Sequence, residues 1–456
     1  MPLNCRSVVI LARWQILLDL FSASLVSLRL ARTLYTFLWL LALPVVLLRL
    51  LWQSRAEPIY ACQISQRLGF FPSIAAAPTI WLHAVSVGET RAAEPLIRAL
   101  KAHWPYARIL LTQTTASGRA TAHALFDEHV VLAWLPWDLP WAQRAFFERW
   151  KPAIGILMET ELWPNLVAEC THAGVPISLI NARLSPRSAR GYARLSALVH
   201  PMLDTLSVIA AQTQADASRL EALGARTVAV TGNLKFDVTV PDGLRVLSTR
   251  WRASVGPRRV VLLASTREGE EVILLPALQA LLPSDVLIVL VPRHPQRFDE
   301  VARLADRHGI RFVRRSADAV PDTGTRLWLG DSMGEMFAWY ALADVAVIGG
   351  SWLPLGGQNL IEACAVGCPV VVGPHTFNFA QATDDAVAAG AALRATDAED
   401  MASAVAALLD DDKKRQAMSE AGLAFAEAHR GATARCMALI EPLLRSRIEE
   451  AAGSHR

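Results

Sequence analysis

The sequence from Pro58 onward alternates short apolar runs with longer stretches in which apolar residues recur at helical spacing. Short apolar runs of this kind are typical of strands that are buried on both faces of a parallel sheet. Helices such as Ala92–His103 and Ala116–Phe126 are therefore expected to cover a first sheet on its two faces. The strands of this sheet are predicted at Thr79–Val85, Arg108–Thr112, Val130–Trp134, Ala153–Met158, Pro176–Ile180, Ser207–Ala211 and Thr227–Thr231.

A second series of strand–helix units follows a segment that lacks a convincing strand and contains Gly232, Pro241, Gly243 and Pro257. We place the connection between two domains in this segment. Two doubly wound domains of similar size imply a cleft between them, and in such sheets ligands bind beyond the carboxyl ends of the strands. The second sheet is predicted to contain strands at Arg259–Ala264, Asp285–Val291, Arg326–Leu329, Asp344–Ile348 and Pro369–Gly373.

The length of 456 residues accommodates about two to three domains. We expect an N-terminal extension with a membrane anchor over residues 1–55, and a first Rossmann-like domain over residues 56–238. A second Rossmann-like domain is expected over residues 239–425, followed at residues 426–456 by a C-terminal helix that packs back toward the first domain. Helical spacing in this last region begins earlier, and it predicts one helix from Lys413 to Glu449.

The most apolar stretch of the chain lies in the N-terminal extension. No charged residue occurs from Thr33 to Leu48, which is about the length of a short membrane span, and arginines and aromatic residues lie near its ends. Pro44 and Arg49 are unfavourable for a spanning helix. We therefore interpret residues 1–55 as an anchor that either spans the membrane or lies in its interface, and Val8–Leu28 within it as an amphipathic stretch.

Composition excludes several classes of function. The net charge is only +3, from 45 basic and 42 acidic residues, so the chain lacks the basic bias of a nucleic-acid-binding protein. Six cysteines without a C-x-x-C pair indicate buried thiols rather than a disulfide framework or a zinc ribbon. No Walker loop is present, and the first predicted strand ends in Val85–Glu89, which is not a G-x-G-x-x-G sequence, so a dinucleotide-dependent dehydrogenase is disfavoured.

Three polar segments follow predicted strands in the first half. Glu89 comes after the first strand, where Gly88 permits a tight turn; it is a candidate general base, or else an acid that favours a helix start. Glu159 and Glu161 follow another strand, where they could bind a sugar or a cation or simply cap a helix. Lys235 lies beside a turn after the last strand, and is a candidate for stabilising developing negative charge.

The second half places four polar or glycine-rich turns after strands, beginning at Pro292, Gly330, Gly349 and Gly373. Arg293 offers a guanidinium for a phosphate or a carboxylate, and the segment around Gly334 offers backbone amides to an anion. Gly356 and Gly357 precede a helix with Glu362 on its first turn, which allows close approach of a phosphate and bonds to sugar hydroxyls. Each turn alone is ordinary loop chemistry, but together they favour a nucleotide-sugar site.

These segments together resemble the Kdo transferases, the 3-deoxy-D-manno-octulosonic acid transferases of lipopolysaccharide assembly. The resemblance runs from about Leu30 to the C-terminal helix, in order and with suitable spacing. The segments that carry it are His83–Glu89 (HAVSVGE), Met158–Asn165 (METELWPN), Asn181–Ser185 (NARLS), Gly232–Asp237 (GNLKFD), Val291–His294 (VPRH), Met333–Met336, Gly356–Glu362 and Gly373–Phe379 (GPHTFNF).

The resemblance implies a membrane-associated, inverting glycosyltransferase of the GT-B fold that needs no metal or other cofactor. It implies transfer of Kdo from CMP-Kdo to the lipid A precursor lipid IVA, by domains on the cytoplasmic side of the inner membrane and without a nucleic-acid partner. Glu89 matches the general base, and Glu159 and Lys235 match residues that stabilise the transition state. The CMP-binding segments match Pro292, Arg293, Met333, Gly334, Glu335, Asn359, Leu360, Ile361 and Glu362.

The chain departs from the pattern of this family in two places. Residues 1–29 extend beyond the usual start, and Arg267 stands where a histidine is expected. Two other functions remain as alternatives: a GT-B enzyme that uses a UDP-sugar, as a transferase to another lipid or as an epimerase, and a catalytically silent membrane-anchored binding module. The presence of Glu89, Glu159 and Lys235 disfavours the silent module.

Overall fold

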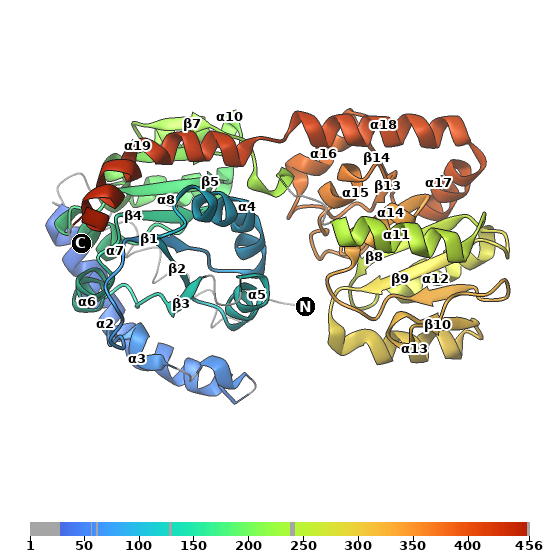
Figure 1. Ribbon diagram of the computed structural model, residues 1–456, viewed down its shortest axis with the longest axis horizontal. Helices are drawn as coiled ribbons and strands as arrows, with labels where there is room; N and C mark the ends of the chain where they lie inside the picture. The colour runs from blue at the N-terminus through green and yellow to red at the C-terminus, as the bar shows by residue number, and fades with distance from the viewer. Residues whose placement is uncertain (1–27, 56, 61–62, 127–129, 238–241, 454–456) are drawn as a thin grey trace. The chain divides into compact units, whose positions relative to one another are not determined.

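The computed structural model describes residues 28–55, 57–60, 63–126, 130–237 and 242–453. The chain divides into two compact units, unit 1 (Met1–Asp237 with Gly431–Arg456) and unit 2 (Val238–Arg430) (Figure 1). Each unit is built on a seven-stranded sheet in which the neighbouring strands are parallel. The expected α/β class, with two Rossmann-like sheets, is confirmed.

The sheet of unit 1 has the strand order β3-β2-β1-β4-β5-β6-β7. The order reverses direction between β1 and β4, and this switch point is where open parallel sheets bind ligands. The strands are β1 (Thr79–His83), β2 (Arg108–Gln113), β3 (Val131–Trp134), β4 (Ile154–Met158), β5 (Ile177–Ala182), β6 (Val208–Ala211) and β7 (Val228–Val230).

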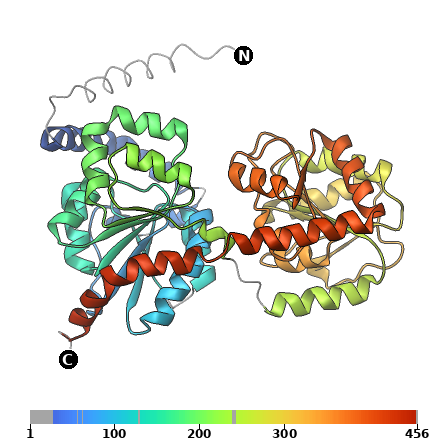
Figure 2. The ribbon, with the colours of Figure 1, turned by 90° about the horizontal axis from the view of Figure 1, so that it is seen from above.

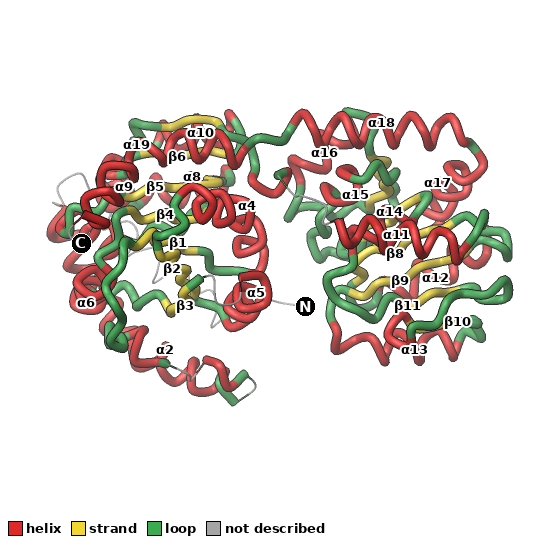
Figure 3. The backbone as a smooth tube through the Cα atoms, in the orientation of Figure 1, coloured by secondary structure: helices red, strands yellow, loops and turns green. Residues whose placement is uncertain are grey.

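Helices cover both faces of this sheet, as the tube drawing shows (Figure 3). One hydrophobic core joins the strands to α4, α5 and α19, and the other joins them to α6, α7, α9 and α10. The helical elements of unit 1 are α2 (Leu28–Gln53), η1 (Pro58–Tyr60), α3 (Ile64–Arg67), α4 (Val87–His103), α5 (Ala116–Phe126), α6 (Pro140–Trp150), α7 (Pro164–His172), α8 (Pro186–Arg194), α9 (Ser196–Thr205), α10 (Gln214–Ala222), η3 (Leu234–Phe236) and α19 (Ala432–Gly453).

The sheet of unit 2 has the order β10-β11-β9-β8-β12-β13-β14, with its switch point between β8 and β12. Its strands are β8 (Val260–Thr266), β9 (Leu287–Pro292), β10 (Phe312–Arg314), β11 (Leu327–Leu329), β12 (Val345–Ile348), β13 (Val370–Val372) and β14 (Ala392–Arg394). The helical elements are α11 (Asp242–Val255), α12 (Glu270–Leu281), η4 (Pro295–Arg297), α13 (Phe298–Arg307), η5 (Arg315–Ala317), α14 (Met336–Leu342), α15 (Ile361–Ala365), α16 (Ala380–Ala388), α17 (Ala398–Asp410) and α18 (Asp412–Ala428).

The prediction of one helix from Lys413 to Glu449 is wrong, because the helix is interrupted between α18 and α19. Gly431 lies in the interruption with φ 88°, a conformation that glycine adopts without strain. Asp237 accepts hydrogen bonds there from the backbone N–H groups of Gly431 (2.6 Å) and Thr433. The interruption is therefore where the chain passes from unit 2 back to unit 1.

Among the described residues, α2 is a helix long and apolar enough to cross a membrane by length and composition. It lies on the outer side of α7 and α9, and Figure 2 shows α2 (dark blue) and α19 (red) on opposite sides of unit 1. Of the amphipathic stretch predicted at Val8–Leu28, all but the last residue lies outside the described residues.

Candidate active site

The two strands at the switch point of unit 1 each lead into one of the predicted acids. Glu89 lies on the first turn of α4, directly after β1, and Glu159 is the first residue after β4. Lys235 lies in η3, after β7. The carboxyl end of this sheet therefore gathers all three residues for which catalytic roles were predicted in the first half of the chain.

Glu89 forms a reciprocal cap with Ser86 at the start of α4. The Ser86 hydroxyl accepts a hydrogen bond from the Glu89 N–H (3.3 Å) and donates one to Glu89 Oε1 (2.9 Å), while Glu89 Oε2 accepts one from the Val85 N–H (2.8 Å). The structural alternative for Glu89, an acid that favours a helix start, is thus realised. Each carboxylate oxygen has a second lone pair, so the cap leaves Glu89 with further capacity to accept a proton.

Burial raises the pKa of Glu89 to about 7, because only 9% of the residue is exposed. The negative charges of Glu159 and Glu161 raise the pKa further, while hydrogen bonds from Val85 and Ser86 oppose the shift. A base is most effective when its pKa lies near the working pH, since it must both be ionised and hold a proton well. The environment of Glu89 therefore brings the pKa of this carboxylate close to neutral pH.

Glu159 and Lys235 form an ion pair with 3.7 Å between Oε1 and Nζ. Both side chains remain about one quarter exposed, at 26% and 21%. Glu159 has φ 55°, a left-handed conformation that costs about 1–3 kcal/mol in a residue other than glycine. Asn181 accepts a hydrogen bond from the Leu234 N–H (3.0 Å) and so fixes the position of η3. The ion pair therefore holds the Lys235 ammonium on a supported segment.

Two further residues belong to the same group: His83, to which the sequence assigned no role, and Glu161, for which sugar binding, cation binding and helix capping were left open. His83 is fully buried, with Nδ1 bound to Thr112 and Nε2 4.0 Å from Glu161 Oε2. Burial lowers the pKa of His83 to about 4, so the ring is neutral at neutral pH. Burial also raises the pKa of Glu161, whose Oε2 accepts a hydrogen bond from Trp163 (3.0 Å). The sequence signal that could have pointed to both residues is their place in the segments His83–Glu89 and Met158–Asn165, which also contain Glu89 and Glu159.

In unit 2, Pro292 ends β9 and Arg293 follows it half-buried, with its N–H bound to the Thr266 carbonyl (2.9 Å). Gly334 has φ 83°, and no atom lies within 4 Å of the position of a Cβ, so its backbone is open to approach. The Glu335 carboxylate is occupied by Arg315 (2.9 Å) and by the Ser332 hydroxyl. Because the Glu335 carboxylate already has these two partners, a ligand would contact Glu335 through its backbone, or would contact the Glu335–Arg315 ion pair from one side.

Asn359 and Glu362 face one another at the start of α15. The Asn359 amide donates to Glu362 Oε1 (3.2 Å), and its oxygen accepts from the Ile361 N–H (3.0 Å). Leu360 and Ile361 are 0% exposed, so their side chains belong to the core and only their backbone could meet a nucleotide. Gly357 has φ 79° and donates its N–H to the Gly350 carbonyl (2.7 Å), which holds the glycine turn against the loop after β12.

Two buried acids that sequence reasoning missed fix the loops at the switch point of unit 2. Glu270 accepts hydrogen bonds from the N–H groups of Arg267 (2.8 Å), Gly350 (2.7 Å) and Trp352 (3.0 Å). Glu271 binds Arg297 through both oxygens, at 2.8 and 2.9 Å. The sequence around Arg267 was noted only for the residue that replaces the expected histidine. In the structure, the residues of this segment that fix the surrounding loops are the two neighbouring carboxylates, Glu270 and Glu271.

We expect Glu270→Ala to lower the free energy of unfolding by about 2–4 kcal/mol, because three backbone donors lose their acceptor in a buried site. Glu270→Gln should cost less, since the amide retains one acceptor oxygen. Urea denaturation measures both, with Glu268→Ala as the control because Glu268 is exposed. Equal stability of the Glu270→Ala and Glu268→Ala variants would contradict the assignment.

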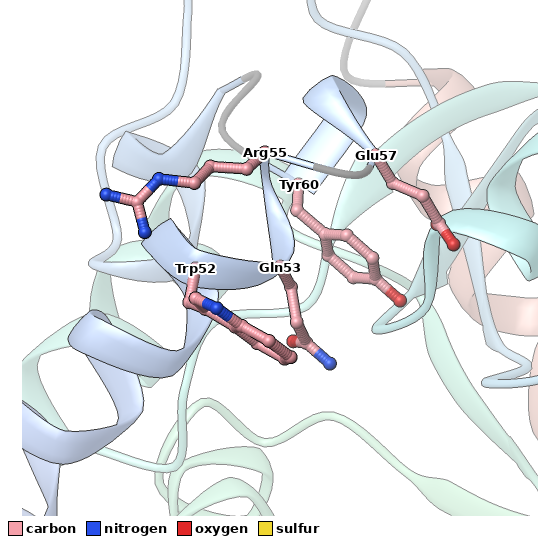
Figure 4. A pocket seen from close by; sticks show the side chains of 5 residues that line it. All are labelled: Trp52, Gln53, Arg55, Glu57 and Tyr60. Carbon is pink, nitrogen blue, oxygen red and sulfur yellow. The ribbon is translucent and has the colours of Figure 1, made fainter.

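An open pocket of about 410 Å³ is lined by Trp52, Gln53, Arg55, Glu57 and Tyr60, at the end of α2 (Figure 4). It contains none of the predicted site residues. No group of three or more histidine, cysteine, aspartate or glutamate residues able to hold a metal ion occurs within the described part of the chain.

Comparison with known proteins identifies the family. Residues 63–238 match the family 3-deoxy-D-manno-octulosonic-acid transferase (kdotransferase), and residues 323–425 match glycosyl transferases group 1. The chain is 47% identical over 384 residues to the 3-deoxy-D-manno-octulosonic acid transferase of Bordetella pertussis, covering 82% of this chain and 89% of that one. It is 37% identical over 424 residues to the transferase of the same name from Haemophilus influenzae, covering 91% and 99%.

Two solved structures share the fold. Anabaena Alr3699/HepE in complex with UDP is 17% identical, with a TM-score of 0.54 over 80% of this chain and 99% of that one. The UDP-GlcNAc 2-epimerase of Neisseria meningitidis is 14% identical, with a TM-score of 0.56 over 80% and 100%. At these identities the likeness concerns the fold alone. Because the high identity to the named transferases extends over most of both chains, this chain belongs to the 3-deoxy-D-manno-octulosonic acid (Kdo) transferase family and is a glycosyltransferase.

Proposed function

We propose that this transferase moves Kdo from CMP-Kdo to the lipid A precursor lipid IVA, with inversion at the anomeric carbon and release of CMP, in lipopolysaccharide biosynthesis. Family membership supports the sugar that is transferred. The observation that carries the proposed mechanism is the Glu89 carboxylate at the switch point of unit 1, with its pKa raised to about 7 and the Glu159–Lys235 pair at the same end of the sheet.

In the proposed reaction, Glu89 removes the proton from an acceptor hydroxyl while that oxygen attacks the anomeric carbon of Kdo. A new carbon–oxygen bond forms, the bond from the anomeric carbon to the phosphate oxygen breaks, and CMP leaves with the electron pair of that bond. An acceptor hydroxyl is a very weak acid, so Glu89 supplies only part of the rate, and the orientation of the reactants supplies more. The Lys235 ammonium, held by Glu159, stabilises the negative charge that develops.

The donor is assigned to unit 2. The half-buried Arg293 guanidinium offsets the charge of the CMP phosphate, and the open backbone at Gly334 offers an N–H group. Asn359 and Glu362 offer an amide and a carboxylate to hydroxyl groups of the nucleotide. Pro292, Met333, Glu335, Leu360 and Ile361 belong to the same segments and would shape the site through backbone or packing contacts. We propose that these protein groups offset the charge of the CMP phosphate without a metal.

The acceptor carries acyl chains. These chains remain in the bilayer, because moving each buried CH₂ group out of the bilayer costs about 0.8 kcal/mol. We propose that α2 holds the enzyme at the inner membrane with its catalytic units on the cytoplasmic side. Anchoring brings the enzyme to the headgroup, so that the lipid need not leave the membrane.

Substrate selection tests this function. The purified protein should be protected against thermal unfolding by CMP but not by UDP, and it should release CMP from CMP-Kdo only when the lipid A precursor is present. Protection by UDP alone would favour a transferase or epimerase that uses a UDP-sugar. A protein that binds nucleotide and never turns over would be a silent binding module. Either result contradicts the proposal.

The rate of transfer should depend on the ionisation of Glu89. Because the pKa of Glu89 is raised, kcat/KM should increase with pH through a limb near pH 7 and level off above it, where the carboxylate is ionised. Glu161→Gln removes a neighbouring negative charge that raises this pKa, so the limb should move to lower pH. Glu148→Gln, at an exposed position, should leave it in place. A limb near pH 4.5 that neither variant moves would exclude Glu89 as the titrating group.

A further inference from the structure

The apolar helix α2 is fixed to unit 1 along its first half. Ala31 is fully buried against Leu198 of α9. The Tyr35 hydroxyl hydrogen-bonds the buried carboxylate of Asp138, and Thr36 exchanges hydrogen bonds with the side chain of Asn165 at 3.1–3.3 Å. These polar contacts require the protein interior, so this part of α2 is part of the folded unit.

The chain returns to the same unit immediately after α2 ends. Tyr60 stacks on Trp134 of β3, with 6.4 Å between ring centroids, and the Gln66 side chain accepts a hydrogen bond from the Trp134 N–H (2.9 Å). Tyr60 comes seven positions after Gln53, so the end of α2 lies within about 25 Å of this contact. A helix that crosses the roughly 30 Å hydrocarbon core places its ends on opposite sides. Contacts at both ends with one unit are incompatible with that arrangement.

The face of α2 that points away from unit 1 is a continuous apolar stripe. Its members recur at spacings of 7, 4, 4, 3 and 4 residues, which places them on one side of an α-helix. They are 54–68% exposed: Leu30, Phe37, Leu41, Val45, Leu48 and Trp52. The stripe extends for about 33 Å along the helix axis. It is long enough to lie along a membrane and has the form of an interfacial helix.

Basic residues occur on α2 itself and on α8, a helix that shares the neighbour α9 with it. From Leu28 to Arg55 the chain contains four arginines and no acidic residue. α8 packs against α9, which also packs against α2, and the segment around α8 has exposed arginines at spacings of 4, 3 and 4 residues and no acid: Arg183, Arg187, Arg190 and Arg194. This charge complements the phosphates of anionic lipids.

We propose that α2 lies in the plane of one leaflet of an anionic bilayer, with its apolar stripe among the acyl chains and the arginines of α2 and α8 at the headgroups, and that it does not span the membrane. This inference rests on the membrane association proposed above but not on the reaction. Asn165, which binds α2 through Thr36, lies in the segment that also contains Glu159. The interfacial helix is thus bonded directly to the segment that carries a candidate catalytic residue.

Labelling of cysteines from each side of the membrane tests the geometry. In the full-length chain with Cys5 and Cys62 replaced by serine, cysteine is introduced singly at Arg29 or Arg55, which flank the apolar stripe. The other four native cysteines are buried, and Lys413→Cys in unit 2 marks the side of the catalytic units. A membrane-impermeant maleimide should label all three positions in inverted inner-membrane vesicles and none in intact spheroplasts.

Labelling of positions 29 and 55 from opposite sides would overturn the in-plane geometry while leaving the reaction untouched. Recovery of the whole protein in the soluble fraction would instead refute the proposed membrane association. Neither outcome depends on turnover, so both outcomes can be distinguished from failure of the proposed transferase reaction.

Vesicle binding tests the contribution of α8. The purified protein should sediment with vesicles that contain phosphatidylglycerol and bind far less to phosphatidylcholine alone. The double variant Arg187→Gln/Arg190→Gln should bind the anionic vesicles about 25-fold more weakly, since each arginine near such a surface contributes about fivefold. Arg303→Gln/Arg307→Gln, an equal charge change on exposed residues of α13, should bind normally. Equal losses in both variants, or no preference for anionic lipid, would contradict the role of α8.

Discussion

Glu89→Gln is expected to lower kcat for Kdo transfer by about 10²–10⁴-fold, the usual contribution of a general base, while leaving the affinity for CMP unchanged. The substitution keeps the size of the side chain and an oxygen that can accept from Val85 or Ser86, but it removes the group that takes the proton. Single-turnover rates at saturating donor and acceptor measure the effect, and CMP titration measures donor binding.

The cap that Glu89 forms with Ser86 requires its own control. Ser86→Ala removes the hydroxyl on which the start of α4 depends and should cost about 1 kcal/mol of stability, but it leaves the carboxylate in place. Its kcat should stay far above that of Glu89→Gln. If both variants lose activity equally, Glu89 acts by holding the helix start rather than as a base.

Lys235→Ala should have the second largest effect, a loss of about 10²–10³-fold in kcat, because a positioned charge that meets the transition state contributes on this scale. The ammonium lies 3.7 Å from Glu159 Oε1 and only 21% of its side chain is exposed, so solvent replaces it poorly. Lys235→Arg keeps the charge and should recover part of the rate. KM for CMP-Kdo should change less than kcat.

A matched surface lysine separates this role from a general effect of charge. Lys413→Ala removes an exposed lysine in unit 2 and should leave kcat unchanged. A loss of less than about threefold in Lys235→Ala, or failure of Lys235→Arg to exceed Lys235→Ala, would remove Lys235 from the transition state.

The sequence predicted the interior of both sheets but missed two of their edge strands. The predicted strands are continuous apolar runs because they are buried on both faces, as in β4, where all five residues are buried. β10 and β14 are three residues long and partly exposed at sheet edges, so they carry little apolar signal. The interruption of the C-terminal helix depended on the conformation of Gly431 and its bond to Asp237, which helical spacing does not report.

Sequence reasoning located the candidate catalytic residues more easily than the residues that support them. Glu89 and Glu159 could be singled out because each follows a strand, and carboxyl ends of parallel strands meet at one edge. The burial of Leu360 and Ile361, and the engagement of Glu335 by Arg315, depend on contacts with residues distant in the sequence. Two of the three backbone N–H groups bound by Glu270, those of Gly350 and Trp352, lie 80 and 82 residues away in the sequence, so these contacts leave no local pattern.

Mass spectrometry of the lipid product tests the central claim most directly. Lipid A precursor recovered after incubation with purified protein and CMP-Kdo should gain the mass of Kdo, with one CMP released for each Kdo added, and the Glu89→Gln variant should yield almost none. An unchanged lipid under conditions where a known Kdo transferase is active would contradict the account, as would normal Kdo addition by the Glu89→Gln variant.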